Sequence, residues 1–145
     1  MRRKAVKRPA LNGEILMDRI DKILNHDLFL YHLGKNNAAE ADRRFCRHSM
    51  VHFLDVARIG TIIALEEGLE LDREWIYAAA LLHDCGKHEQ YENGTPHEQA
   101  SARIAPEILK DCGFDDKETD VIVTAISRHR DPEAAKEKNL NGVLY

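Results

Sequence analysis

The pair His83-Asp84, followed by Cys85-Gly86-Lys87, carries the residues of this chain best suited to chemistry. The pair ends an unbroken apolar run, residues 75–82, which predicts a buried helix. A buried carboxylate without a partner is costly, and at the C-terminal end of a helix Asp84 also faces the negative end of the helix dipole. We therefore expect a positive group beside Asp84, and next to a histidine the natural candidate is a metal ion.

Three further histidines occupy positions where a plain helical bundle would place Leu or Val. His52 and His129 each share a helical face with three apolar residues, and His97 lies in the first turn of a predicted helix. A single histidine on an apolar face is more often a hydrogen-bonded core residue than a ligand. Taken together, the histidines are better candidates for metal ligands, because one ion would satisfy several of these groups. The apolar partners are Val56, Ile59 and Ile63 for His52, and Ile122, Ala125 and Ile126 for His129.

Helical periodicity dominates the chain and strand alternation is nearly absent, which predicts an all-α fold of five or six helices. A length of 145 residues suits one domain. The predicted helices cover residues 12–25, 27–44, 45–68, 71–86, 95–112 and 114–130. The second is predicted to be interrupted near residues 34–37, and the fifth to have Thr95 as its N-cap and a kink at Pro106. Residues 91–96 and 131–142 are predicted loops.

Composition limits the function classes. The formal net charge of −4, from 21 basic and 25 acidic residues, argues against broad nucleic-acid binding. Residues 1–11 form a basic tail that resembles no secretory signal, and we expect it to be disordered or to touch a polyanion. No apolar stretch reaches the length of a membrane helix. The scattered, odd set of cysteines forms no disulfide framework and fits a reducing cytoplasm; it comprises Cys46, Cys85 and Cys112.

The residues around the doublet and the first histidine resemble the HD-domain superfamily of metal-dependent phosphohydrolases. The resemblance rests on His52-Phe-Leu-Asp-Val-Ala-Arg58 and on Ala80-Leu-Leu-His-Asp-Cys-Gly-Lys87, and it covers about residues 45–145. It implies a helical domain over residues 12–145 and a metal held by His52, His83 and Asp84. Some bacterial members with this histidine spacing hold two metals and hydrolyse dinucleoside polyphosphates. By resemblance, Asp84 would bridge to a second metal held by His97 and His129.

One feature departs from the family pattern. That pattern ends with an aspartate in a later helix, usually in an Ala-Asp pair followed by a basic residue. The chain reaches Leu140-Asn-Gly-Val-Leu-Tyr145 about where that helix is expected, and Asp131 is too close to His129 to match it. We therefore expect a domain that lacks its last helix or helices, with apolar surface left uncovered; a homodimer is one way to cover it.

The resemblance implies a mechanism in which a metal-activated hydroxide attacks phosphorus. One or two ions of Fe, Mn, Zn, Co or Ni suit imidazole and carboxylate ligands. Asp84 and Lys87 would be the catalytic residues, acting on a small phosphorylated substrate such as a nucleotide. Candidate substrate contacts are Lys87, His48, Arg128 and Arg130, whereas His26, His32 and His88 lie in polar surroundings and are predicted surface residues.

Three alternatives stay open at this point. The chain could be a non-catalytic metal-binding or interaction domain of the same type, which would hold stoichiometric metal without turning over a phosphate ester. It could be a metal-free bundle whose histidines are hydrogen-bonded, and chelation would then not lower its stability. A di-iron oxygenase is the most distant option, because nothing in the residues selects for redox chemistry.

Overall fold

A computed structural model of the protein describes residues 18–41 and 50–145. The described residues form helices and no strand, which confirms the predicted all-α fold. The predicted number of helices is exceeded because the chain folds into several short helices in addition to the long ones. The helices are α1 (Asp18–Leu24), α2 (Asp27–Ala39), α3 (Met50–Glu66), α4 (Arg73–Leu82), α5 (Lys87–Asn93), α6 (His97–Asp111), α7 (Asp116–Ser127), the 3-10 helix η1 (Pro132–Lys136) and α8 (Leu140–Leu144).

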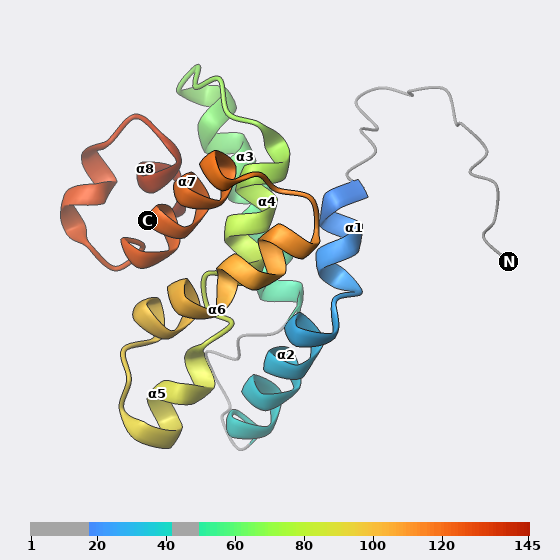
Figure 1. Ribbon diagram of the computed structural model, residues 1–145. Helices are drawn as coiled ribbons and strands as arrows, with labels where there is room; N and C mark the ends of the chain where they lie inside the picture. The colour runs from blue at the N-terminus through green and yellow to red at the C-terminus, as the bar shows by residue number, and fades with distance from the viewer. Residues whose placement is uncertain (1–17, 42–49) are drawn as a thin grey trace, which may run out of the picture.

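Helix α4 is the centre of the domain. It is the predicted apolar helix, and every residue from Ala78 to Leu82 is completely buried. Asp72 caps its N-terminus by accepting a hydrogen bond from the amide of Glu74. Helices α1, α3, α6, α7 and α8 all contact α4, and Figure 1 shows them arranged around it. Three consecutive alanines permit this close approach, because their side chains occupy little space.

Helix α3 faces the core with a stripe that matches the predicted one only in part: Val56 and Ile63 are half-buried and pack against the core. Its buried residues are Phe53, Ala57, Gly60 and Ala64. Ile59 is 57 % exposed, so the prediction that it faces the core is wrong. Small residues let α3 lie close to α4 and α8: a Cβ on Gly60 would lie 3.1 Å from Ile76 and 3.2 Å from Val143. The larger aliphatic side chains are turned outward as a result, namely Val51, Ile59, Ile62 and Leu65.

Helix α2 is continuous through residues 34–37, so the predicted interruption there is wrong. Gly34 has a low helix propensity, but the helix is stabilised by packing. Phe29, His32 and Asn36 are buried on one face, and Asn36 is completely buried. The helix packs against α5 rather than against α4, as seen at the lower part of Figure 1.

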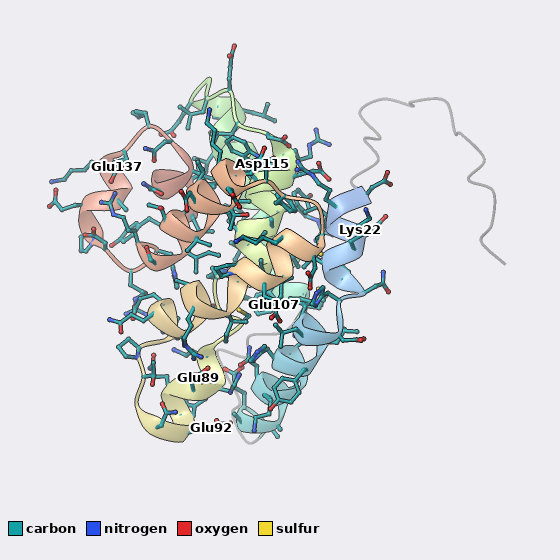
Figure 2. The ribbon with its side chains drawn as sticks, in the orientation of Figure 1. Lys22, Glu89, Glu92, Glu107, Asp115 and Glu137 are labelled. Atoms are coloured by element: carbon teal, nitrogen blue, oxygen red, sulfur yellow. The ribbon has the colours of Figure 1, made fainter. Side chains whose placement is uncertain are left out.

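Polar contacts fasten α1 to the core. The guanidinium of Arg19 bonds Glu74 of α4 at 2.9 Å and Glu118 of α7 at 2.9 Å. Trp75 donates its indole N–H to Glu118 at 2.6 Å, so one carboxylate joins three helices. Glu118 also completes a capping box with Asp115 at the start of α7. Elsewhere, charged side chains such as Lys22, Glu92 and Glu107 project from the outer faces of their helices (Figure 2).

The predicted loop over residues 131–142 is wrong in part. It contains η1 and the start of α8, and α8 buries Leu140, Val143 and Leu144 against α3, α4 and α7. Asn139 caps α8 through its side-chain oxygen. Three apolar residues in five are too few for a periodic signal, so only tertiary packing identifies this helix.

Other boundaries shift by a few residues. Helix α5 extends to Asn93, so the predicted 91–96 loop is reduced to Gly94, whose φ is +79°, and the two residues after it. Helix α6 passes through Pro106 and ends at Asp111. Cys85 and Cys112 are free and buried. No helix in the described part of the chain is long and apolar enough to cross a membrane. The basic tail, Cys46 and His48 lie outside the described residues.

Candidate metal centre

The His83-Asp84 pair lies in a tight turn between two helices. Helix α4 ends at Leu82, and α5 begins at Lys87, so His83 to Gly86 form the connection. All four residues of the turn are buried. The amide of His83 still donates to Ala79, and the amide of Lys87 donates to the carbonyl of Asp84. The turn therefore places a carboxylate inside the domain, directly after its most apolar helix.

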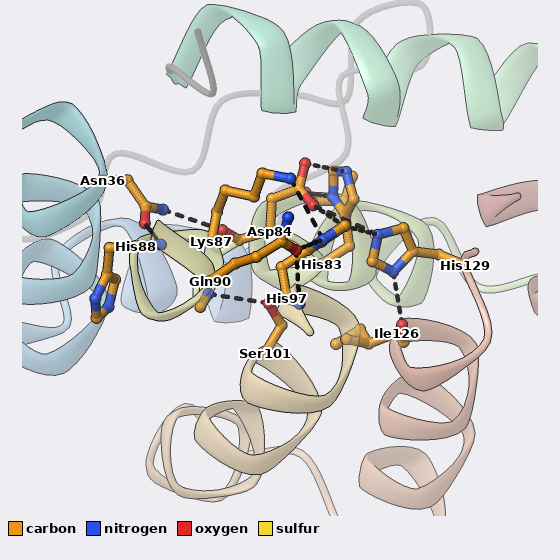
Figure 3. A network of polar contacts seen from close by, with 12 residues as sticks. Asn36, His83, Asp84, Lys87, His88, Gln90, His97, Ser101, Ile126 and His129 are labelled. Carbon is orange, nitrogen blue, oxygen red and sulfur yellow. Dashed lines mark hydrogen bonds and ion pairs between the residues drawn. The ribbon is translucent and has the colours of Figure 1, made fainter. Parts of the chain in front are cut away.

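The two oxygens of Asp84 face two different groups of histidines. Oδ2 lies 3.1 Å from Nε2 of His83. Oδ1 lies 3.3 Å from Nε2 of His97 and 3.4 Å from Nε2 of His129. The Nε2 atoms of His97 and His129 are only 3.0 Å apart. Figure 3 shows these rings converging on the carboxylate from α4, α6 and the segment after α7.

The other ring nitrogen of each of these histidines contacts a carbonyl oxygen. Nδ1 of His83 lies 2.6 Å from the carbonyl of Ala80, and Nδ1 of His129 lies 2.7 Å from that of Ile126. Nδ1 of His97 lies 2.8 Å from the side-chain oxygen of Gln90. A carbonyl can only accept, so each Nδ1 carries a proton, and in the neutral form of each ring the Nε2 lone pair is directed at Asp84. Hydrogen bonds of this kind typically orient histidines that bind metals.

The arrangement concentrates electron pairs in a small volume. Two Nε2 lone pairs at 3.0 Å repel each other unless a proton or a metal ion is held beside them. Potential ligand atoms within 4.8 Å of one another form two groups, His52-His83-Asp84 and Asp84-His97-His129. Within the described residues, Asp84 is the carboxylate of both groups. Three imidazoles or carboxylates per ion suit a divalent transition metal and leave coordination positions open.

His52 completes the first group from α3. It is half-buried, and its ring centroid lies 6.1 Å from that of His83. Because α3 turns its small residues to the core, His52 lies at the border of the buried stripe rather than within it. The five residues that the sequence proposed as ligands therefore come together in space, from four separate segments.

Burial and neighbouring charges set the protonation of the histidines. Burial, together with the charges of Lys87, His129 and Arg130, lowers the pKa of His97 to about 4 despite the opposing charge of Asp84. His97 is then neutral at pH 7, the form that binds a metal. For His83, burial also disfavours the charged form, but its contact with Asp84 outweighs this and raises its pKa. Contact with Asp84 therefore favours the charged form of the His83 ring.

The predicted substrate contacts have different environments. Lys87 is part-buried, with Nζ 3.4 Å from Nδ1 of His97, so its charge adjoins the second group. Arg130 is exposed, and its charge reaches His97. Arg128 is already paired with Asp131 at 3.1 Å and with Glu137. The fourth candidate, His48, is outside the described residues.

Gln90 is a site residue that the sequence analysis did not identify. Its side-chain oxygen accepts from Nδ1 of His97 at 2.8 Å and from the backbone amide of His97 at 3.2 Å. It takes the place of the predicted N-cap Thr95, whose hydroxyl instead donates to Asn93. The prediction for Thr95 is therefore wrong. No local signal marks Gln90, because its partner belongs to the next helix.

The prediction that His26, His32 and His88 are ordinary surface residues is wrong. His32 and His88 are buried, and Nδ1 of His32 lies 2.8 Å from Nε2 of His88. His26 is half-buried: Nδ1 accepts from the amide of Leu28 and caps α2, and Nε2 lies 2.8 Å from Asp111. The polar residues around them in the sequence point to other sides of α2 and α5, which is why they look exposed.

Comparison with known proteins identifies the family. The model of the HD domain family matches residues 50–144, so this chain belongs to the HD domain family. The match spans α3 to α8 and includes all five candidate ligands. An uncharacterized protein of Clostridium beijerinckii is 46 % identical over 129 residues, which cover 89 % of this chain and 80 % of that protein. No solved structure matches the chain.

Proposed function

We propose that this protein is a metal-dependent phosphohydrolase that acts on a small phosphate ester, such as a nucleotide. One observation carries the proposal: the two oxygens of Asp84 face two separate histidine groups, whose Nε2 atoms are directed at it by contacts between Nδ1 and carbonyl oxygens. One or two ions of Fe, Mn, Zn, Co or Ni fit these ligands. When bound, such a metal supplies Lewis-acid activation of water and of a phosphoryl oxygen.

The protein's own residues would position that chemistry. His52, His83 and Asp84 would hold one ion, and Asp84 with His97 and His129 the other. Binding a metal to the first group would require the release of any proton on His83, and contact with Asp84 raises the pKa of that ring. His97 needs no such release at pH 7, because its pKa is about 4.

Lys87 would bind the phosphoryl group. Its ammonium lies within 3.4 Å of the His97 ring and 5.7 Å from the centre of the Tyr91 ring, so it is held beside the second group. It can neutralise charge that builds on phosphoryl oxygens as the ester bond breaks. Arg130 is the next cation available, whereas Arg128 is engaged by Asp131 and Glu137.

The test combines metal content with turnover. Elemental mass spectrometry of the purified protein measures the metal per mole of chain, and the protein is then reconstituted with each of the five metals. Each form is assayed against a panel of phosphate mono- and diesters, nucleotides and dinucleoside polyphosphates. The proposal expects stoichiometric metal and metal-dependent release of phosphate or nucleotide. A protein that takes up no metal under any condition would refute it.

A non-catalytic metal-binding domain is the second candidate. It is favoured by the presence of a single carboxylate in both ligand groups of the described residues. It predicts full metal occupancy, stabilisation of the fold by the metal, and no turnover of any ester in the panel. The same two measurements therefore separate the two functions.

A further inference from the structure

The turn that carries Asp84 is held from two sides by residues that are not ligands. On one side stands Asn36 of α2, which is completely buried. On the other stands Ser101 of α6, which is also completely buried. Figure 3 shows both near the turn, one on each side. Both side chains are polar, so their burial requires hydrogen-bond partners inside the domain.

Asn36 bridges the two ends of the turn. Its amide nitrogen donates to the carbonyl of Asp84 at 3.0 Å, and its side-chain oxygen accepts from the backbone amide of His88 at 2.9 Å. The two partners settle the orientation of the amide, since a carbonyl must accept and an N–H must donate. Asn36 thus ties the backbone of a proposed ligand directly to the first turn of α5.

Ser101 fixes the same turn from the opposite direction. Its hydroxyl oxygen accepts from the backbone amide of Gly86 at 2.9 Å. The contact requires glycine at this position, because a Cβ on Gly86 would lie 2.6 Å from the Ala100 side chain and 2.7 Å from the amide of Ser101. The turn is therefore pressed against α6, the helix whose first residue is His97.

We infer that Asn36 and Ser101 are positioning residues that hold Asp84 where it can serve both histidine groups. This inference rests on the proposed metal site and names the part of the fold that presets it. The turn has only short backbone bonds of its own, from Cys85 to Leu82 and from Lys87 to Asp84, and the backbone amide of Gly86 is bonded by Ser101 instead. A ligand that is already ordered before the metal arrives loses less conformational entropy on binding. Supporting partners of this kind typically change metal affinity by about 10–100-fold.

The test uses cobalt(II) as the probe, because its visible absorption reports ligand geometry. Asn36→Leu keeps the volume and removes both hydrogen bonds, and Ser101→Ala removes the hydroxyl. The matched controls are Asn37→Leu, at an exposed neighbouring position of α2, and Ser127→Ala, at the exposed end of α7. Titration of each metal-free protein gives the cobalt dissociation constant and the spectrum per bound ion, and thermal unfolding is measured in parallel.

We expect Asn36→Leu to weaken cobalt binding about tenfold or more and to shift the absorption bands. Ser101→Ala should do the same to a smaller extent, and the controls should match the wild type. Folded variants that bind cobalt within twofold of the wild type with the same spectrum would overturn the inference, even if their unfolding temperature falls.

Two further outcomes, a variant that does not fold and a wild type that binds no cobalt, can also be interpreted. If Asn36→Leu does not fold, Ser101→Ala is judged by the same criterion. If the wild type itself binds no cobalt, the proposed metal site fails first and the inference fails with it. Because that failure is seen in the wild type alone, it is distinguishable from a failure confined to the variants.

Discussion

The described part of the domain contains two buried histidine clusters, one formed by His32 and His88 and one around Asp84. They differ in the groups that their ring nitrogens contact. In the pair His32-His88, one ring nitrogen faces the other at 2.8 Å and the rings stack with centroids 5.0 Å apart. One proton can bridge these two nitrogens, and the other ring nitrogen of His88, Nδ1, lies 3.4 Å from Glu92. Around Asp84, by contrast, each Nδ1 bonds a carbonyl oxygen and the Nε2 atoms are left to face a carboxylate. Burial alone therefore does not distinguish a ligand histidine from a structural one.

The largest effect that tests this comparison is expected from Asp84→Ala. Without the shared carboxylate, both ligand groups lose a member, so metal binding and hydrolysis should both fall to background. Asp84→Asn, which keeps the volume, should give the same loss. Asp55→Ala is the matched control, because Asp55 is an exposed carboxylate on α3 paired with Arg58. Metal content and turnover are measured together, and hydrolysis that survives in either Asp84 variant would contradict the site.

Removing one member of the other cluster should affect stability instead. His32→Leu leaves a buried nitrogen of His88 without its partner, and we expect unfolding free energy to fall by about 1–3 kcal/mol. Metal content should not change. The double variant His32→Leu/His88→Leu should recover part of the loss, because no buried donor or acceptor is then orphaned. Urea unfolding measures the first effect. A loss of bound metal in His32→Leu would show that the two clusters are not separate.

A smaller effect is expected from Gln90→Leu, which removes the carbonyl that orients His97. Both tautomers of His97 then become available, and metal affinity should fall about tenfold. Gln99→Leu, at an exposed position of α6, is the control. Competition with a chromophoric chelator gives the dissociation constants. Equal affinities for Gln90→Leu and wild type would mean that the tautomer of His97 is set in another way.

The smallest effect concerns pH. Burial, together with the neighbouring His88, lowers the pKa of His32 to about 4, compared with about 6.5 in the unfolded chain. Between these values the unfolded chain binds a proton that the folded chain does not, so the stability of the metal-free protein should fall as pH drops from about 6.5 to 4. In His32→Leu the slope of unfolding free energy against pH should be smaller, by an amount that corresponds to at most one bound proton. His97 keeps its own share, because its pKa is lowered to about 4 as well. Thermal unfolding across this pH range checks it, and an unchanged slope would contradict the assignment.

Much of the fold and of the candidate site could be predicted from the sequence, because the relevant signals are local. The apolar run 75–82 is the buried centre of the fold, and His97 begins α6 as expected. His129 follows the buried residues Ile122, Ala125 and Ile126, in agreement with its predicted inward face. Each of these features depends on spacing within a single helix, which the order of residues specifies directly.

The tertiary structure decided which buried polar groups meet. Asn36 lies 48 positions from Asp84, and His32 lies 56 positions from His88, yet each pair is within 3.0 Å. The sequence placed Asn36 in a break in a helix and His32 and His88 on the surface, because both segments are polar. It also placed Ile59 of α3 in the core, where Ala57 and Gly60 are buried and Ile59 is exposed. The sequence by itself determined the long helices and the histidines and aspartate that are proposed as ligands. Only packing between distant helices decided where each lone pair points, because a hydrogen-bond partner is selected by proximity in space and not along the chain.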